Sequence, residues 1–189
     1  ERLLTRAEAE LGHLEPAEAL CDEALALDGI DPEVRGTVHG QRAVVRLRRG
    51  RRAAALADFN AAIRLLSADH QALGRNLLNR GNLHLETGQA AKALADFEQA
   101  VVESDAAGQA GQAAKARHNA GYAAFLLGDH VRALTDMDAV AGHFAAQSPA
   151  ARAISLQDRA EVLAAAGLRD DAVAHLRQAV ALFHTARAR

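Results

Sequence analysis

The sequence predicts an all-α solenoid of five antiparallel helix-turn-helix repeats, with about ten helices. Alanine, the strongest helix former, makes up about a quarter of the chain. The segment Ala-Leu-Ala-Asp-Phe occurs at 55–59 and 93–97, and the variant Ala-Leu-Thr-Asp-Met follows at 133–137. Each copy starts five residues after a glycine, and equivalent glycines lie at positions 12, 50, 88, 128 and 167. A fixed period of about 20–50 residues is typical of stacked repeats.

Glycines and capping residues set the expected helix boundaries. A tight turn between two helices needs a residue that adopts positive φ at little cost, which is glycine. Asp31-Pro32 and Ser148-Pro149 each place an N-cap residue before a proline in the first helical position, and Pro16 is expected to start a helix in the same way. We therefore expect helices over residues 1–11, 16–28, 32–48, 51–66, 69–87, 89–105, 109–127, 129–145, 149–166 and 168–186.

These helices group into one domain over residues 1–189. The expected repeats span about 1–30, 31–67, 68–106, 107–147 and 148–189. Small residues stand seven positions before each turn glycine, and large apolar residues stand nine positions after it, so the paired helices are expected to pack closely. Cys21 takes the large apolar position of the first repeat and is expected to be a core residue. Neither end supplies a polar terminal repeat, so we expect a module of a larger protein.

Composition and spacing argue against several functions. The formal net charge is −2, with 22 basic and 24 acidic residues interspersed, which argues against a nucleic-acid surface. No apolar run is long enough for a membrane span, and one cysteine cannot form an internal disulfide. The nine histidines show no metal-ligand or nucleophile spacing. We therefore expect no catalytic residue, no cofactor and no metal.

The third repeat carries the pattern that identifies a family. Its residues Gly81, Gly88, Ala93, Phe97 and Ala100 resemble the tetratricopeptide repeat (TPR), and the other four repeats follow with small departures. The resemblance implies a right-handed superhelix that binds protein segments in its concave groove. The period of 38 to 40 residues exceeds the usual 34 and is similar to repeats of the kinesin light chain kind. Segments 77–85, 118–122 and 158–168 also resemble actinobacterial repeat regions that precede a CHAT (caspase-like) domain, which implies a bacterial, cytoplasmic protein.

The first helix of each repeat is expected to line that groove. Nine positions before the turn glycine stand Gln41, Asn79, Asn119 and Asp158, here called the polar ladder. An amide both donates to and accepts from a peptide backbone, so this ladder could hold an extended segment. Nearby residues form an aromatic and polar patch of the kind that anchors interfaces. The full expected binding set is Gln41, Asn79, Asn82, Leu85, His118, Asn119, Tyr122, Phe125 and Asp158. The structural alternative is that the asparagines bond between neighbouring helices and hold the repeat spacing.

Charged residues also repeat. Arg42, Arg80 and Arg159 stand eight positions before a turn glycine, while Asp58, Asp96 and Asp136 stand eight positions after one. We expect ion pairs within or between repeats. The densest basic run, residues 46–52, is interpreted as a solvated helix end and turn, with docking of an acidic partner segment as the alternative.

The function expected from these observations is a non-catalytic scaffold that binds a protein or peptide segment, and neither nucleic acid nor membrane. One alternative is an architectural segment whose open end repeats pair two copies of the chain as a homo-oligomer. An enzyme would require a pocket with converging titratable groups.

Overall fold

The computed structural model describes residues 13–187, with side chains described through residue 184. This part of the chain forms nine α-helices and no strand. The helices are α2 (Leu14–Ala26), α3 (Pro32–Arg48), α4 (Arg52–Leu65), α5 (His70–Glu86), α6 (Ala90–Ala106), α7 (Ala110–Leu126), α8 (His130–Gln147), α9 (Pro149–Ala165) and α10 (Arg169–Arg187). The predicted all-α solenoid is confirmed, while the helix expected over residues 1–11 lies outside the described residues.

Glycine turns connect the helices of each hairpin. Gly50, Gly88, Gly128 and Gly167 have φ of 74°, 71°, 89° and 83°, as the repeat pattern predicts, and Gly12 lies outside the described residues. Gly29 and Gly108 also adopt positive φ, at 69° and 66°, and lie between hairpins. The repeat pattern does not predict these two, because no equivalent glycine recurs in the other repeats.

The N-caps predicted for α3 and α9 are confirmed. The side chain of Asp31 accepts from the Glu33 amide at 2.9 Å, and the hydroxyl of Ser148 accepts from the Ala151 amide at 3.1 Å. The expected start at Pro16 is wrong, because α2 begins two residues earlier, at Leu14. Proline is tolerated there because the amides of the first helical turn have no partner within the helix.

The core is a row of small clusters rather than one centre. Phe59 packs with Ala43, Ala55 and with Leu83 of the following hairpin, and Phe97 packs in the same way against α7. In the first four repeats the residue nine positions after the turn glycine is almost fully enclosed, with Cys21 1%, Phe59 0%, Phe97 0% and Met137 1% exposed, whereas Leu176 in the fifth is 44% exposed. Each hairpin is therefore completed by its neighbour, as expected for a linear stack.

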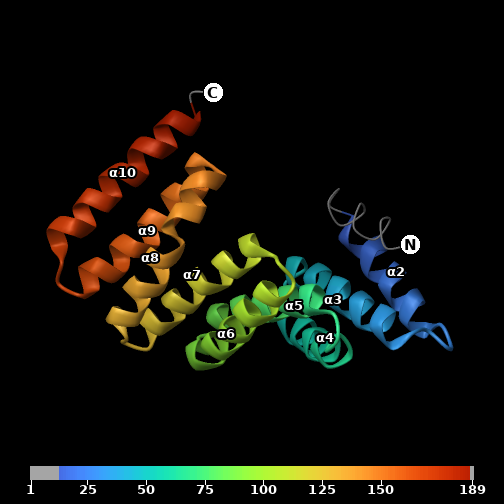
Figure 1. The fold of residues 1–189 in the computed structure, drawn as a ribbon. Helices are drawn as coiled ribbons and strands as arrows, with labels where there is room; N and C mark the ends of the chain where they lie inside the picture. Colours follow the sequence, from blue (N-terminus) through green and yellow to red (C-terminus); the bar gives the residue numbers. More distant parts are fainter. Residues whose placement is uncertain (1–12, 188–189) are drawn as a thin grey trace.

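The stack curves because the first helices of successive hairpins lie closer to one another than the second helices do. The backbone of α3 approaches that of α5, α5 approaches α7, and α7 approaches α9. The second helices of successive hairpins, α2 to α10 in even numbers, make no such approach. The layer of α3, α5, α7 and α9 is therefore the inner one, and we call its solvent side the inner face. Figure 1 shows the hairpins following one another along a curved row, with α2 and α10 on separate arms.

None of the described helices combines the length and apolar character that crossing a bilayer requires.

Candidate functional site

The polar ladder lies on the inner layer, but its members do not form one uninterrupted array. Asn79, Asn119 and Asp158 are half-buried on α5, α7 and α9. Asn119 donates its side-chain amide to the Asn82 side-chain oxygen at 2.8 Å, and this bond joins α7 to α5. The Asn79 side chain makes no hydrogen bond to a described residue. The Asn119 amide therefore links α7 to α5, whereas no such bond engages the Asn79 side chain.

His118 is buried between α7, α8 and α9. The residue is 4% exposed, and its Nε2 lies 2.9 Å from Asp158 Oδ2 on α9. Its ring also packs against Phe144 of α8, with a centroid distance of 4.9 Å. The expectation that His118 contacts a partner is thus corrected: the curvature of the stack brings α9 over it, and the histidine pairs with Asp158, which is itself a ladder member.

The aromatic residues of the expected patch lie together. The rings of Tyr122 and Phe125 are 5.7 Å apart between centroids, and both pack against the cluster around Met137. The Tyr122 hydroxyl donates to Glu161 on α9 at 3.2 Å, at an exposed position. Burial and the adjacent Glu161 carboxylate raise the pKa of Tyr122. Leu85 packs one hairpin earlier, against the cluster around Phe97. The patch therefore rests on the core clusters around Phe97 and Met137.

Gln41 lies apart from these residues, in a pocket of about 450 Å³ between α2 and α3. Leu20, Leu27 and Val34 supply apolar lining, and the acidic side chains of the described lining are Glu23, Glu33 and Asp69. Cys21 also reaches this pocket, but burial raises the pKa of its thiol to about 11. A protonated thiol beside carboxylates offers no activated nucleophile.

Two of the expected Arg–Asp pairs form, and they have the same geometry. Arg42 binds Asp58 through Nε and Nη2 at 2.9 and 2.6 Å, and Arg80 binds Asp96 at 2.8 and 2.6 Å. Each arginine also reaches the preceding hairpin, Arg42 at Asp22 and Arg80 at Asn60. These arginines join three helices apiece.

The pattern changes in the later hairpins. The fourth repeat has Ala120 at the arginine position, so Asp136 pairs with Arg132 of its own helix instead. Arg159 pairs with Asp138 of the preceding helix α8. Both departures follow from the absence of the usual partner at the equivalent position.

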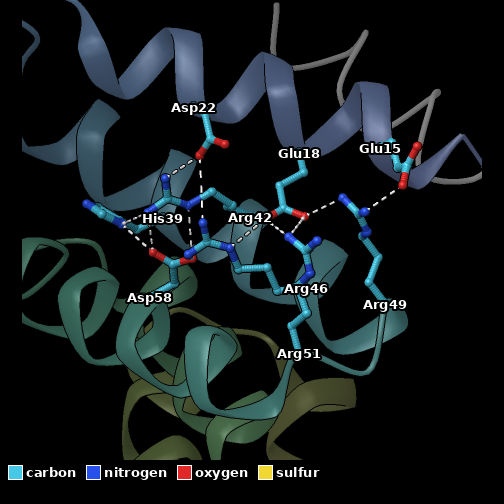
Figure 2. A network of polar contacts seen from close by, with 9 residues as sticks. All are labelled: Glu15, Glu18, Asp22, His39, Arg42, Arg46, Arg49, Arg51 and Asp58. Carbon is cyan, nitrogen blue, oxygen red and sulfur yellow. Dashed lines mark hydrogen bonds and ion pairs between the residues drawn. The ribbon is translucent and has the colours of Figure 1, made fainter.

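Three arginines of the basic run over residues 46–52 pair with acidic side chains of α2. Glu18, which is 4% exposed, accepts from Arg46 at 2.9 Å, from Arg49 at 2.7 Å and from Arg51 at 3.1 Å. Figure 2 shows Glu15, Glu18 and Asp22 directed from α2 toward these arginines. The solvated interpretation is wrong for Arg46 and Arg49, which pair with acidic side chains of α2 in the same chain, while the side chains of Arg51 and Arg52 remain more than half exposed.

This network lowers carboxyl pKa values despite burial. Burial alone would raise the pKa of Asp58, but the bonds from His39 and Arg42 and the charges of Arg42 and Arg46 bring it down to about 2. Burial likewise opposes ionisation of Glu18, and its arginine partners outweigh that effect and lower its pKa. Both carboxylates are therefore ionised at neutral pH.

The repeat pattern gave no signal for Asn76. It is 3% exposed on α5, donates to the Ala72 carbonyl at 2.8 Å, and fills the space beside Gly40 of α3. A hydrophobic pattern predicts an apolar residue at such a buried position, so this contact becomes visible only when α3 and α5 are placed together.

The described residues contain no group of three or more His, Cys, Asp or Glu side chains that could hold a metal ion. The chemistry that the described inner face offers is hydrogen bonding through amides and contact through aromatic rings.

These features define the class of protein as an all-α helical repeat solenoid of the TPR-like kind. Residues 74–101 match the family model of the tetratricopeptide repeat. A comparison with curated protein sequences gives no significant match.

Solved structures with the same architecture cover nearly the whole chain. BtubC (BKLC) from P. vanneervenii is 17% identical with a TM-score of 0.85, and the match covers 98% of this chain and 79% of that one. A putative kinesin light chain from Podosopora anserina, with nearly identical TPR-like repeats, is 17% identical with a TM-score of 0.79, covering 100% and 95%. YrrB, a TPR protein with an unusual peptide-binding site, is 21% identical with a TM-score of 0.70, covering 94% and 82%. At these identities the likeness shows the fold alone.

Proposed function

We propose that this protein is a non-catalytic interaction scaffold that binds an extended segment of a partner protein along its inner face. The observation that carries the proposal is the half-buried Asn79 amide, which has no hydrogen-bonding partner among the described residues, on the same layer as the core-supported Tyr122 and Phe125. YrrB, which shares the fold, is described as having a peptide-binding site. A TPR-type match at residues 74–101 falls on the same part of the stack.

The chemistry of this region suits a peptide backbone. The Asn79 side chain can both donate to and accept from a main-chain amide. Asn82 keeps donor capacity after it accepts from Asn119. Tyr122, Phe125 and Leu85 offer rigid apolar area for one or two side chains of the partner, and tyrosine is enriched at energetically dominant interface positions. The centre of the proposed site is therefore Asn79, Asn82, Leu85, Tyr122 and Phe125, with Gln41 near its N-terminal end.

The wider setting is also a proposal. The resemblance to repeat regions beside CHAT domains supports a bacterial, cytoplasmic protein in which this segment is the regulatory or recognition part. The interspersed charges support a protein partner over nucleic acid or a membrane surface.

A peptide selection tests the proposal. A random 12-residue peptide library displayed on phage is selected on the wild-type chain, and the recovered peptides are titrated by fluorescence anisotropy. Asn79→Ala and Tyr122→Ala are each expected to weaken binding by about fivefold or more, because a backbone hydrogen bond or an aromatic anchor is lost. Gln99→Ala, at an exposed position on α6, is the matched control and should leave affinity unchanged. Recovery of no peptide, or equal affinity for all variants, would contradict the proposal.

The second candidate function is an architectural segment that associates through its open ends. The observation that favours it is the set of apolar side chains left exposed on α10.

A further inference from the structure

The inner face carries charges of both signs, and the two signs lie on different helices. In each inner helix, three residues spaced by four and then three positions share one side of the helix. These sets are Thr37, Gln41 and Val44 on α3; Arg75, Asn79 and Asn82 on α5; Lys115, Asn119 and Tyr122 on α7; and Ile154, Asp158 and Glu161 on α9. The cations of the sets therefore lie on α5 and α7, whereas the carboxylates lie on α9.

Lys115 is an exposed cation on α7 with no anion assigned to it. Its side chain makes no hydrogen bond or ion pair to a described residue. Helix α7 itself contains no acidic residue. The described inner helices therefore leave the charge of Lys115 uncompensated.

The register between α5 and α7 brings this cation to the Asn79 amide. Asn119 bonds to Asn82 at 2.8 Å, and α5 and α7 run in the same direction because α6 alone lies between them in the chain. Four residues earlier on each helix, Lys115 lies beside Leu78, which directly precedes Asn79. An ammonium group and an amide N–H can both donate to one carboxylate. We call Lys115 and Asn79 the cationic corner.

The opposite sign gathers around Tyr122. Its hydroxyl donates to Glu161 at 3.2 Å, and its ring lies 5.7 Å from that of Phe125. Burial and the charges of Glu161 and Asp158 raise the pKa of Tyr122, so both carboxylates act on the same hydroxyl. Asp158 is also bonded to His118, whereas Glu161 is exposed and keeps further acceptor capacity. Carboxylates beside aromatic rings attract a cation, and we call Tyr122, Phe125 and Glu161 the anionic corner.

One extended segment can reach both corners. Lys115 and Tyr122 are seven residues apart on α7, which is about 10 Å along the helix. Packed helix axes lie about 8–10 Å apart, so Glu161 of α9 lies roughly 14 Å from Lys115 across the face. An extended chain covers that distance in about four residues. Helix α7 has a described hairpin on either side, so the exposure of Lys115 and Tyr122 does not follow from an end of the chain.

We propose that the inner face selects a partner segment with an acidic and a basic side chain about four residues apart, the acidic one at the cationic corner and the basic one at the anionic corner. This inference rests on the proposed function, because it names the charge pattern of the segment that binds there. A segment with charges of one sign only brings like charges together at one of the two corners, which disfavours it.

The test compares peptide selections on the wild-type chain, on Lys115→Glu and on Glu161→Lys. The probe is a library of random 12-residue peptides joined to the phage at their C-termini, so a preference for acidic residues reports side chains. Wild type should enrich peptides with an acidic and a basic residue about three to five positions apart. Lys115→Glu should lose the acidic preference, and Glu161→Lys should lose the basic one. Lys92→Glu and Asp105→Lys, at exposed positions on α6, are the matched controls and should recover the wild-type pattern.

A charge exchange between peptide and protein gives the second measurement. One recovered peptide is titrated by fluorescence anisotropy, together with the same peptide in which the acidic residue is changed to lysine. Lys115→Glu should weaken binding of the first peptide about tenfold and strengthen binding of the second, because it exchanges attraction for repulsion. Its melting temperature should stay within about 1 °C of wild type, since Lys115 is exposed and makes no bond that is lost.

The results distinguish this inference from the proposed function. Recovered peptides that Asn79→Ala weakens but that carry no charge pair would overturn the inference and leave the proposed function standing. The same holds if Lys115→Glu and Glu161→Lys recover the wild-type peptides with unchanged affinity. Recovery of no peptide by the wild-type chain would overturn both.

Discussion

The ring of Phe97 lies directly against Gly81, so that the two helices of the third hairpin touch at their closest point. A Cβ placed on Gly81 would lie 2.5 Å from Cε1 of that ring, well inside contact distance. Phe97 itself is 0% exposed and bridges to Ala120 and Ala123 of the next hairpin. Gly81 on α5 therefore leaves the space that the large Phe97 side chain on α6 fills, across the turn at Gly88.

The first prediction concerns this contact. Phe97→Ala should destabilise the chain by about 3–5 kcal/mol, because it leaves a cavity between two hairpins. Gly81→Leu should be comparably damaging, because its side chain would force α5 and α6 apart. Urea unfolding followed by circular dichroism measures both.

A glycine in open space is the control for this pair. Gly142 lies in α8, and a Cβ added there meets nothing within 4 Å. Gly142→Ala should therefore stabilise the chain by about 0.5–1 kcal/mol through helix propensity. A loss below about 1 kcal/mol for Phe97→Ala would mean that the hairpins do not pack as described.

The second prediction concerns the α2–α3 interface. In the later hairpins, the position six residues after the turn glycine holds Leu56, Leu94, Leu134 or Val173, but in the first it holds the buried Glu18. Glu18→Ala should cost about 3 kcal/mol, because it leaves arginines without their shared partner in a partly buried site. Glu15→Ala should cost less than about 1 kcal/mol, since Glu15 is 82% exposed. Equal costs in urea unfolding would show that the network is only a surface feature.

The third prediction is a pH dependence with a defined sign. The pKa of Asp58 falls from 3.8 to about 2 on folding, so the unfolded chain binds the proton more tightly. This stabilisation is present above about pH 4, amounts to roughly 2 kcal/mol, and is lost as the pH falls toward 2. Glu18, whose pKa is also lowered, contributes in the same direction.

Comparison of wild type with Asp58→Asn isolates that contribution. The difference in unfolding free energy between the two should be largest near neutral pH and should shrink as the pH falls toward 2. A difference that stays constant between pH 7 and pH 2.5 would contradict the assignment.

The fourth prediction is slow reaction of the single thiol. Cys21 is 1% exposed, and burial raises its pKa to about 11, so at neutral pH it is both inaccessible and protonated. Reaction with a disulfide reagent should proceed only through opening of the α2–α3 interface. The rate of thiol labelling should therefore rise in Glu18→Ala, which weakens the α2–α3 interface. It should stay unchanged in Phe97→Ala, because this interface opens independently of the later hairpins. Instant labelling of the native wild type would contradict the packing of α2.

How well the sequence predicts a contact in this structure depends on how far apart the two residues stand along the chain. Turn glycines and buried Phe97 are predictable because each hairpin repeats them within a local pattern. The bond between Asn119 and Asn82 spans 37 residues, and that between Arg46 and Glu18 spans 28. Such contacts depend on how one helix is rotated against another, which a one-dimensional pattern does not specify. The sequence of an arginine run is the same whether its side chains are solvated or paired with Glu18, so the pattern alone does not distinguish the two.

The candidate site shows the same division. The pattern correctly places Asn79, Asn119 and Asp158 on one layer, because they share a position in the repeat. It gives no indication that Asn119 is bonded to Asn82 while Asn79 is not. The difference becomes clear once α3 and α5 are placed side by side, because the residue of α3 equivalent to Asn82 is Val44, whose side chain has no hydrogen-bond acceptor.

The fifth prediction is that Asn119 contributes to stability and Asn79 to peptide affinity. Asn119→Ala removes the bond to Asn82 between α7 and α5 and should lower stability by about 1 kcal/mol. Asn79→Ala breaks no hydrogen bond to a described residue and should leave the melting temperature within about 1 °C of wild type. With a peptide recovered by selection, Asn79→Ala should instead weaken affinity by about fivefold or more. Thermal melts and anisotropy titrations on the same preparations give the contrast. A fall in melting temperature for Asn79→Ala with unchanged affinity would assign this residue to repeat spacing and place the binding surface elsewhere.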